Sequence, residues 1–269
     1  MKRQFRGAAF AAAPFLIGTA AHAQRSSAYT APRNAVVDAA GAKSVAVEAG
    51  AGSLRVEGKS GLRQVQVIGT ARASSQRILS QIKLVAERRG DLVFIKADIP
   101  EHDDDYYDNY SAGLDLVIEV PQGIDADISD GSGDARILNV GALEAQDGSG
   151  ELRIDGAASV RVTDGSGSLT IENVRGDVTV NDGSGEIDVR NIAGSFNVQS
   201  DGSGSISATD VRGSVIVESD GSGSIDVSKI GKDFRVDSKG SGDIGYMDVV
   251  GRVDIPERHR DHRRRGDER

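Results

Sequence analysis

The 269-residue sequence contains no cysteine and no tryptophan, and only 4% of its residues are aromatic. Without cysteine the chain forms no disulfide and carries no lipid on a lipobox cysteine, so its stability must come from packing and backbone hydrogen bonds. The scarcity of aromatic rings removes the usual platforms on which enzymes stack sugars. Beyond the N-terminus no apolar stretch approaches the ~20 residues that span a bilayer, so we expect no transmembrane segment in the mature chain.

Residues 1–23 have the pattern of a secretory signal peptide. Three basic residues at positions 2, 3 and 6 precede an apolar stretch over residues 8–21, and Ala21-His22-Ala23 is a small-x-small cleavage site. The sequence therefore predicts an exported protein whose mature form begins at Gln24. We expect it in the periplasm, with the cell surface as the alternative.

The chain is acidic, with a formal net charge of −9. Because the predicted signal peptide carries three positive and no negative side chains, the mature chain has a formal net charge of −12. Such a body repels nucleic acid and anionic lipid, so we expect no nucleic-acid partner. Residues 256–269 hold six arginines and four acids and are predicted to be a disordered charged tail.

From residue 130 onward a four-residue word recurs at intervals of 17 to 19 residues. Asp-Gly-Ser-Gly occurs six times, and a final copy begins with Lys239 in place of aspartate. The six aspartates that open the words are Asp130, Asp147, Asp164, Asp182, Asp201 and Asp220. Glycine accepts positive φ, and aspartate can hydrogen-bond its own downstream backbone, so each word predicts a tight turn.

Apolar residues follow each word with the spacing of β-strands. One repeat gives Leu169 and Ile171, then Val174, then Val178 and Val180. Spacing by two is typical of a strand with one buried face, so each repeat holds two short strands. A unit of this size cannot bury its own apolar face, whereas stacked units bury a continuous core. We therefore predict an all-β fold, an elongated parallel β-solenoid over residues 124–255.

The preceding residues, 24–123, are predicted to form an irregular β-rich N-terminal part. Residues 50–56 repeat the Gly-Ser-Gly strand start, and Val65 and Val67 follow as a second strand. This pattern predicts an atypical first coil or cap.

The rest of the N-terminal part contains three further predicted elements. The apolar spacing over residues 75–82 indicates one short helix. Residues 83–86 and 92–99 indicate a hairpin around Gly90, and residues 114–120 form an alternating strand.

These features together resemble the bacterial "putative adhesin" β-strand-repeat family of envelope proteins. The matching features are the signal peptide, the hairpin, the strand that runs into Val120-Pro121, and the iterated Ser-Gly-x-Ile-x-Val and Gly-x-Val-x-Val units. The resemblance covers roughly residues 35–255. It implies a right-handed parallel β-solenoid or β-roll outside the cytoplasm, in a family whose biochemical role is largely undefined. It supplies no catalytic residues.

Stacking of the words would place the six aspartates in one file at intervals of about 4.8 Å, where neighbouring charges repel. Calcium takes six to eight oxygen ligands, so the file is a candidate calcium ladder. The hydroxyls of the word serines are candidate additional ligands: Ser132, Ser149, Ser166, Ser184, Ser203 and Ser222. The alternative is that each aspartate is a solvated turn residue. Lys239 fits either alternative, because it would neutralise the end of the row.

A second acidic cluster lies between two predicted strands and consists of Asp103, Asp104, Asp105, Tyr106, Tyr107 and Asp108. Long loops on rigid scaffolds often carry function, so this cluster is a candidate site for a partner or a cation. The alternative is a solvated loop that blocks the edges of the sheet.

These observations favour a non-enzymatic exported scaffold or adhesin-like interaction protein. Its expected partner is an envelope protein, a cell-wall polymer or a second copy of the chain. No nucleophile elbow and no phosphate-binding loop motif occurs in the sequence, and no histidine accompanies the word serines. Two alternatives remain: a polysaccharide-degrading β-helix enzyme, although the repeats lack the long insertions that carry catalytic groups, and a calcium-binding repeat protein.

Overall fold

The computed structural model describes residues 29–101 and 110–257. The predicted signal peptide, the acidic cluster at residues 103–108 and all but the first two residues of the predicted tail lie outside this part of the chain. Within the described ranges, no helix is both long and apolar enough to cross a membrane.

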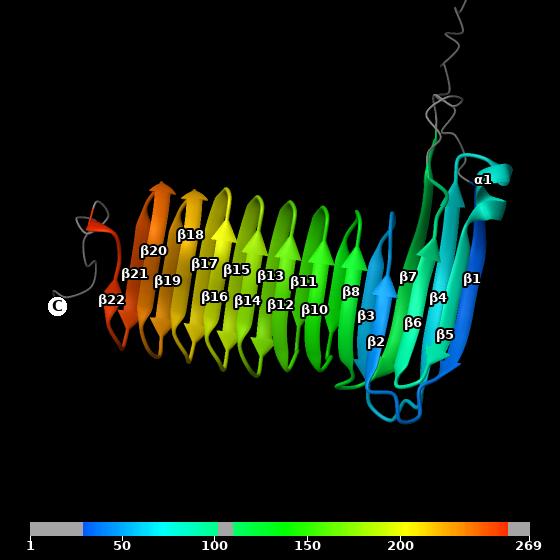
Figure 1. Cartoon of the computed structure of the whole chain (residues 1–269), viewed down its shortest axis with the longest axis horizontal. Coiled ribbons are helices and arrows are strands. Elements are labelled where there is room, and N and C mark those ends of the chain that lie inside the picture. Colours follow the sequence, from blue (N-terminus) through cyan, green and yellow to red (C-terminus); the bar gives the residue numbers. More distant parts are fainter. Residues whose placement is uncertain (1–28, 102–109, 258–269) are drawn as a thin grey trace, which may run out of the picture.

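The described chain is an elongated stack of strands arranged as two 11-stranded sheets, sheet A and sheet B, around one apolar core (Figure 1). Each turn contributes one strand to each sheet, and the strands of successive turns pair in parallel and in register. The predicted all-β solenoid is confirmed, with about seven turns.

Each turn begins with a strand of sheet B and continues into a strand of sheet A. The sheet B strands are β8 (Asp125–Asp130), β10 (Ala142–Asp147), β12 (Ser159–Asp164), β14 (Val178–Asp182), β16 (Phe196–Asp201), β18 (Val215–Ser222) and β20 (Phe234–Ser241). The sheet A strands are β9 (Ala135–Leu138), β11 (Gly150–Asp155), β13 (Gly167–Val174), β15 (Gly185–Ile192), β17 (Gly204–Val211), β19 (Ile225–Ile230) and β21 (Ile244–Val249). A short strand, β22 (Val253–Asp254), follows the last turn.

The core is formed by the apolar positions that the sequence predicted. In the repeat of β13 and β14, the five apolar residues Leu169, Ile171, Val174, Val178 and Val180 are at most 1% exposed. Polar side chains alternate with them and face outward, as the strand period requires. The solenoid is therefore held together by aliphatic packing between two sheets.

The last turn is less covered than the others. Tyr246, Val249 and Val253 pack against the core but are only partly buried, because no further turn covers them within the described residues. Met247 and Val250 are exposed. The C-terminal end of the stack therefore leaves apolar side chains accessible to solvent.

The first solenoid turn is built differently from the prediction. Strand β3 (Leu54–Lys59) lies between β7 (Ala112–Pro121) and β9, as predicted for a first coil. Its partner strand in the turn is β2 (Ser44–Glu48), which lies between β6 (Leu92–Asp98) and β8. The prediction that Val65 and Val67 supply the second strand of this coil is wrong. They lie in β4 (Gln64–Ala73), which pairs antiparallel with β7 and with β1 (Tyr29–Asp38).

The other elements of the N-terminal part are confirmed. Ser75 caps α1 (Gln76–Gln81), where its Oγ accepts a hydrogen bond from the Ile78 N–H at 3.3 Å. Strand β5 (Lys83–Arg89) pairs antiparallel with β6 as the predicted hairpin, and β7 ends at Pro121. The helix lies beside β1 and β4 at the N-terminal end of the stack (Figure 1).

A β-bulge accommodates the extra residue of the 19-residue repeats. The pairing of β14 with β16 shifts register between Val180 and Asn181. Two successive residues of β16, Gln199 and Ser200, are exposed, and Asp201 is then buried again. The bulge therefore keeps the word aspartate on the inner face even though the repeat is longer.

The word corner, which joins each sheet B strand to the next sheet A strand, requires glycine at its last position. Gly204 has φ +145°, and a Cβ built there would lie 1.5 Å from the carbonyl oxygen of Gly185 in the preceding turn. Any side chain at this point would push the two turns apart. The glycines thus allow successive turns to lie at strand spacing.

Candidate functional site: a buried aspartate column

Strands β8, β10, β12, β14 and β16 end on the aspartate that opens a word, and β18 runs through its word aspartate to Ser222. In β8, Ala126 and Ile128 point into the core, and the strand period of two places Asp130 on the same face. The same burial pattern recurs in β10 and β12. Each of these strands therefore carries an aspartate at a position that faces the core.

The six word aspartates form one column along the interior of the solenoid, which we call the aspartate column. They are Asp130, Asp147, Asp164, Asp182, Asp201 and Asp220, and each is the register partner of the next. Their exposed fractions lie between 1% and 6%. The expected single file is present, but the alternative of solvated turn residues is wrong, because the carboxylates are enclosed by the corner.

Burial raises the pKa of the first five carboxyl groups of the column, because a charge is costly away from water. The pKa rises to about 7 at Asp130 and Asp201 and to about 6 at Asp147 and Asp182, where repulsion from neighbouring aspartates adds to the increase. At Asp130 a hydrogen bond from the Gly131 N–H to Oδ1, at 3.0 Å, opposes the increase. These five carboxyl groups therefore titrate as a coupled set and not independently.

Lys239 takes the place of aspartate in the last word and enters the column. Its Nζ lies 2.7 Å from Oδ2 of Asp220, and both side chains are fully buried. The ammonium also donates to the carbonyl oxygens of Gly223, at 2.7 Å, and of Ser241. Lys239 therefore neutralises the C-terminal end of the column through three oxygen ligands.

The oxygens in the middle of the column lack such partners. Both carboxylate oxygens of Asp147, Asp164 and Asp201 are buried without a hydrogen-bond partner among the described residues. The word serines, expected to add hydroxyl ligands, are exposed or half-buried, unlike the aspartates. In the described part of the chain, no three acidic, histidine or cysteine side chains form one metal-binding group. An ion inside the column would therefore contact two carboxylates, one from each of two successive turns.

The raised pKa values predict that the metal-free protein is more stable at pH 5 than at pH 8. Between pH 4 and 7 the folded column holds more protons than the unfolded chain, so its contribution to stability is lost as the pH rises through this range. Thermal melts in chelator should show a melting temperature lower at pH 8 by on the order of 10 °C. The variant Asp147→Asn/Asp201→Asn should flatten this dependence, whereas Asp188→Asn on the outer face should not. A pH-independent melting temperature of the wild type would contradict the prediction.

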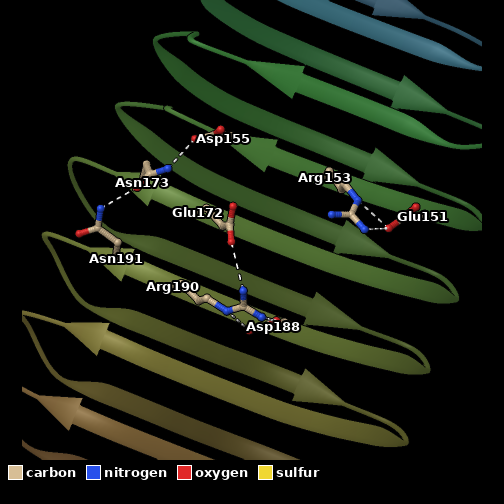
Figure 2. Close-up of polar contacts among 8 residues, drawn as sticks. All are labelled: Glu151, Arg153, Asp155, Glu172, Asn173, Asp188, Arg190 and Asn191. Atoms are coloured by element: carbon tan, nitrogen blue, oxygen red, sulfur yellow. Dashed lines mark hydrogen bonds and ion pairs between the residues drawn. The ribbon is translucent and has the colours of Figure 1, made fainter.

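Ion pairs on the outer face of sheet A connect neighbouring turns (Figure 2). Arg190 in β15 contacts Asp188 of its own strand and Glu172 of the preceding turn, the latter at 3.4 Å. Arg153 Nε donates to Glu151 at 2.6 Å in β11. These pairs are exposed, so each adds at most about 1 kcal/mol to stability, and their main effect is to order the surface.

A ladder of amide side chains lies at the corner where sheet A strands end (Figure 2). Asn191 Nδ2 donates to Asn173 Oδ1 at 2.6 Å, and Asn173 Nδ2 donates to Asp155 Oδ1 at 2.7 Å. Asn173 and Asn191 have φ of 58° and 55°, a region that asparagine tolerates better than most residues. The sequence analysis missed this ladder, although a recurring Asn or Asp just before the third apolar residue of a repeat was a visible signal.

A groove on the outer face of sheet B was also missed. It has a volume of about 480 Å³ and crosses β2, β8, β10, β12 and β14, which are neighbours in the sheet. Its floor includes a row of register partners: Asp127, Glu144, Arg161 and Thr179. Residues far apart in the sequence meet there, so no local motif marks the groove.

These features define the class of the protein: an elongated repeat β-solenoid of the kind seen in solved structures described as putative adhesins. A putative adhesin from Bacteroides fragilis matches 85% of this chain and 97% of its own, with a TM-score of 0.50 and 14% identity. A putative cell adhesion protein from Clostridium sporogenes covers 84% and 99%, with a TM-score of 0.35 and 11% identity. A putative lipid binding protein from Parabacteroides distasonis covers 82% and 96%, with a TM-score of 0.37 and 12% identity.

Comparison at the sequence level adds nothing to this: no family model matches the chain, and no curated protein matches it either. The resemblance stated from the sequence is therefore confirmed at the level of the fold.

Proposed function

We propose that this protein is a non-enzymatic, exported scaffold of the bacterial envelope that holds an extended cell-wall polymer along the groove of sheet B. The observation that carries the proposal is the groove itself. It runs across five parallel strands, a distance of about 20 Å at the usual strand spacing, and it is open to solvent and carries charged side chains of both signs. Such a surface accommodates an extended, chain-like ligand.

The chemistry of the groove favours binding rather than catalysis. Asp127 and Glu144 lie side by side but are exposed, and no described side chain encloses them. A general acid or base usually requires a carboxyl group whose environment is tuned by burial. Arg161 and Thr179 beside them supply donors for the hydroxyl and amide groups of a polar polymer. The adhesin description of the Bacteroides fragilis structure agrees with this role.

Co-sedimentation with purified peptidoglycan sacculi tests the proposal. We expect the wild-type protein to pellet with sacculi, and the charge-swap variant Glu144→Lys/Arg161→Glu to lose at least about fivefold of the bound fraction. The matched control is Glu151→Lys/Arg153→Glu, which swaps the same residue types on the outer face of sheet A. Equal binding by both variants, or no binding by the wild type, would overturn the proposal.

Two further outcomes distinguish other functions. Capture of a defined envelope protein on the groove, with no retention by sacculi, would indicate a protein partner instead of a polymer. Release of reducing ends from the sacculi by the wild type, lost in the groove variant, would indicate the polysaccharide-degrading enzyme.

A further inference from the structure

The buried lysine at the end of the aspartate column shows what the interior of the corner binds. The ammonium of Lys239 is a cation held by one carboxylate and two backbone carbonyls, those of Asp220, Gly223 and Ser241. All three ligands are oxygens, and all three lie in the repeated words. A cation-binding arrangement is therefore already present in this fold, with the cation supplied by the chain itself.

The backbone arrangement around these carbonyl groups recurs at four of the five earlier steps of the column. At the end of the column the Gly223 N–H donates to the Ser241 carbonyl oxygen, and the equivalent hydrogen bond forms at four earlier steps, for example from Gly150 to Ser166 and from Gly167 to Ser184. At these steps the position of Lys239 is occupied by a second aspartate. By analogy with the Lys239 step, each of these four steps offers two carboxylates and two carbonyl oxygens, six candidate ligand atoms.

We propose that the aspartate column is a calcium site, with two ions bound between Asp130 and Asp147 and between Asp164 and Asp182. The carboxylates of these steps are nine-tenths or more buried, and both oxygens of Asp147 and Asp164 lack a hydrogen-bond partner among the described residues. Buried carboxylates without partners are costly, and a hard divalent cation supplies the missing interaction.

Strand spacing selects calcium over magnesium. Carboxylates that repeat at a strand spacing of about 4.8 Å are bridged more readily by calcium, whose oxygen ligands lie at about 2.3–2.6 Å, than by magnesium, whose ligands lie at about 2.0–2.1 Å. Calcium also accepts the irregular geometry of carboxylates and carbonyls, whereas magnesium requires a near-ideal octahedron.

Charge fixes the number of ions at two. Divalent ions in adjacent steps would lie about 4.8 Å apart and share a carboxylate, so their repulsion favours alternate steps. The step between Asp201 and Asp220 lies next to the ammonium of Lys239, which repels a divalent cation. Four steps remain, and alternate occupancy that starts at the N-terminal end of the column, farthest from Lys239, gives the two steps named in the proposal.

The test is a thermal melt at pH 8 in 1 mM calcium and in chelator, combined with equilibrium dialysis against radioactive calcium. We expect calcium to raise the melting temperature by roughly 5 °C or more, magnesium and sodium at equal ionic strength to raise it much less, and about two calcium ions to stay bound. The variant Asp147→Asn/Asp164→Asn should lose the response and the bound ions. The outer-face variant Asp188→Asn/Asp226→Asn on sheet A is the control and should keep both.

Several outcomes would overturn the calcium site. Retention of no calcium by the wild type, together with an unchanged melting temperature, would mean that protons alone neutralise the column. Equal calcium binding by the Asp147→Asn/Asp164→Asn variant would place the ions elsewhere. The sacculus experiment is carried out in chelator as well, so failure of the calcium site and failure of the groove are distinguishable.

Discussion

Replacement of Gly204 by alanine is expected to lower the melting temperature by about 10 °C or more, or to prevent folding. The added Cβ would lie 1.5 Å from the carbonyl oxygen of Gly185, and φ at this position is +145°. Neither partner is a flexible side chain that can move away, so the two turns must separate. Separation breaks the core and the hydrogen bonds on both sides of the word corner. Circular dichroism during heating measures the effect.

Gly61→Ala is the matched control for this prediction. Gly61 also has positive φ, +79°, but no atom lies within 4 Å of a Cβ built there. We expect a decrease of only a few degrees, which corresponds to the conformational cost of about 1–2 kcal/mol for alanine in this region. Equal melting temperatures for the two variants would mean that the words do not lie directly above one another.

Substitution of Lys239 by methionine is expected to cause the second large loss of stability. It removes the partner of a fully buried carboxylate, a change that typically costs about 3–5 kcal/mol, because the remaining charge is enclosed without compensation. At pH 8 we expect the melting temperature to fall by roughly 10 °C.

The double variant Lys239→Met/Asp220→Asn separates the charge effect from the loss of packing. Because both members of the pair are then neutral, we expect recovery of most of the lost stability at pH 8. The contact of the ammonium with the carbonyl oxygens of Gly223 and Ser241 is not recovered, so the rescue is incomplete. A double variant that is no more stable than the single one would show that the ion pair is not what Lys239 contributes.

The repeat could be predicted because its signals are local. Spacing by two fixed the inner faces of the strands, and the Gly-Ser-Gly words fixed the corners where the turns lie close together. The insertion of β3 between β7 and β9, and of β2 between β6 and β8, was not predictable, because it depends on pairing between segments distant in sequence. Val65 and Val67 are buried as a strand pattern requires, yet periodicity says nothing about which strand lies beside them.

The aspartate column was predicted in its alignment but not in its burial. Turn chemistry suggested a solvated carboxylate, whereas the strand period in β8 counts Ala126, Ile128 and Asp130 as one inner face. The strand period, and not the turn chemistry, determines the burial of the aspartate, because each strand continues to the aspartate before the chain turns. In β16 the aspartate is buried only because of a β-bulge, and this bulge is visible only in the pairing of the strands.

Titration of the aspartate carboxyl carbons by nuclear magnetic resonance, in metal-free buffer, tests most directly whether the column is buried as described. The account predicts a group of aspartates that titrate together with midpoints near 6 to 7, shifted by the single substitution Asp182→Asn. If every aspartate of the chain instead titrates near pH 4, the column is open to water and the account is wrong.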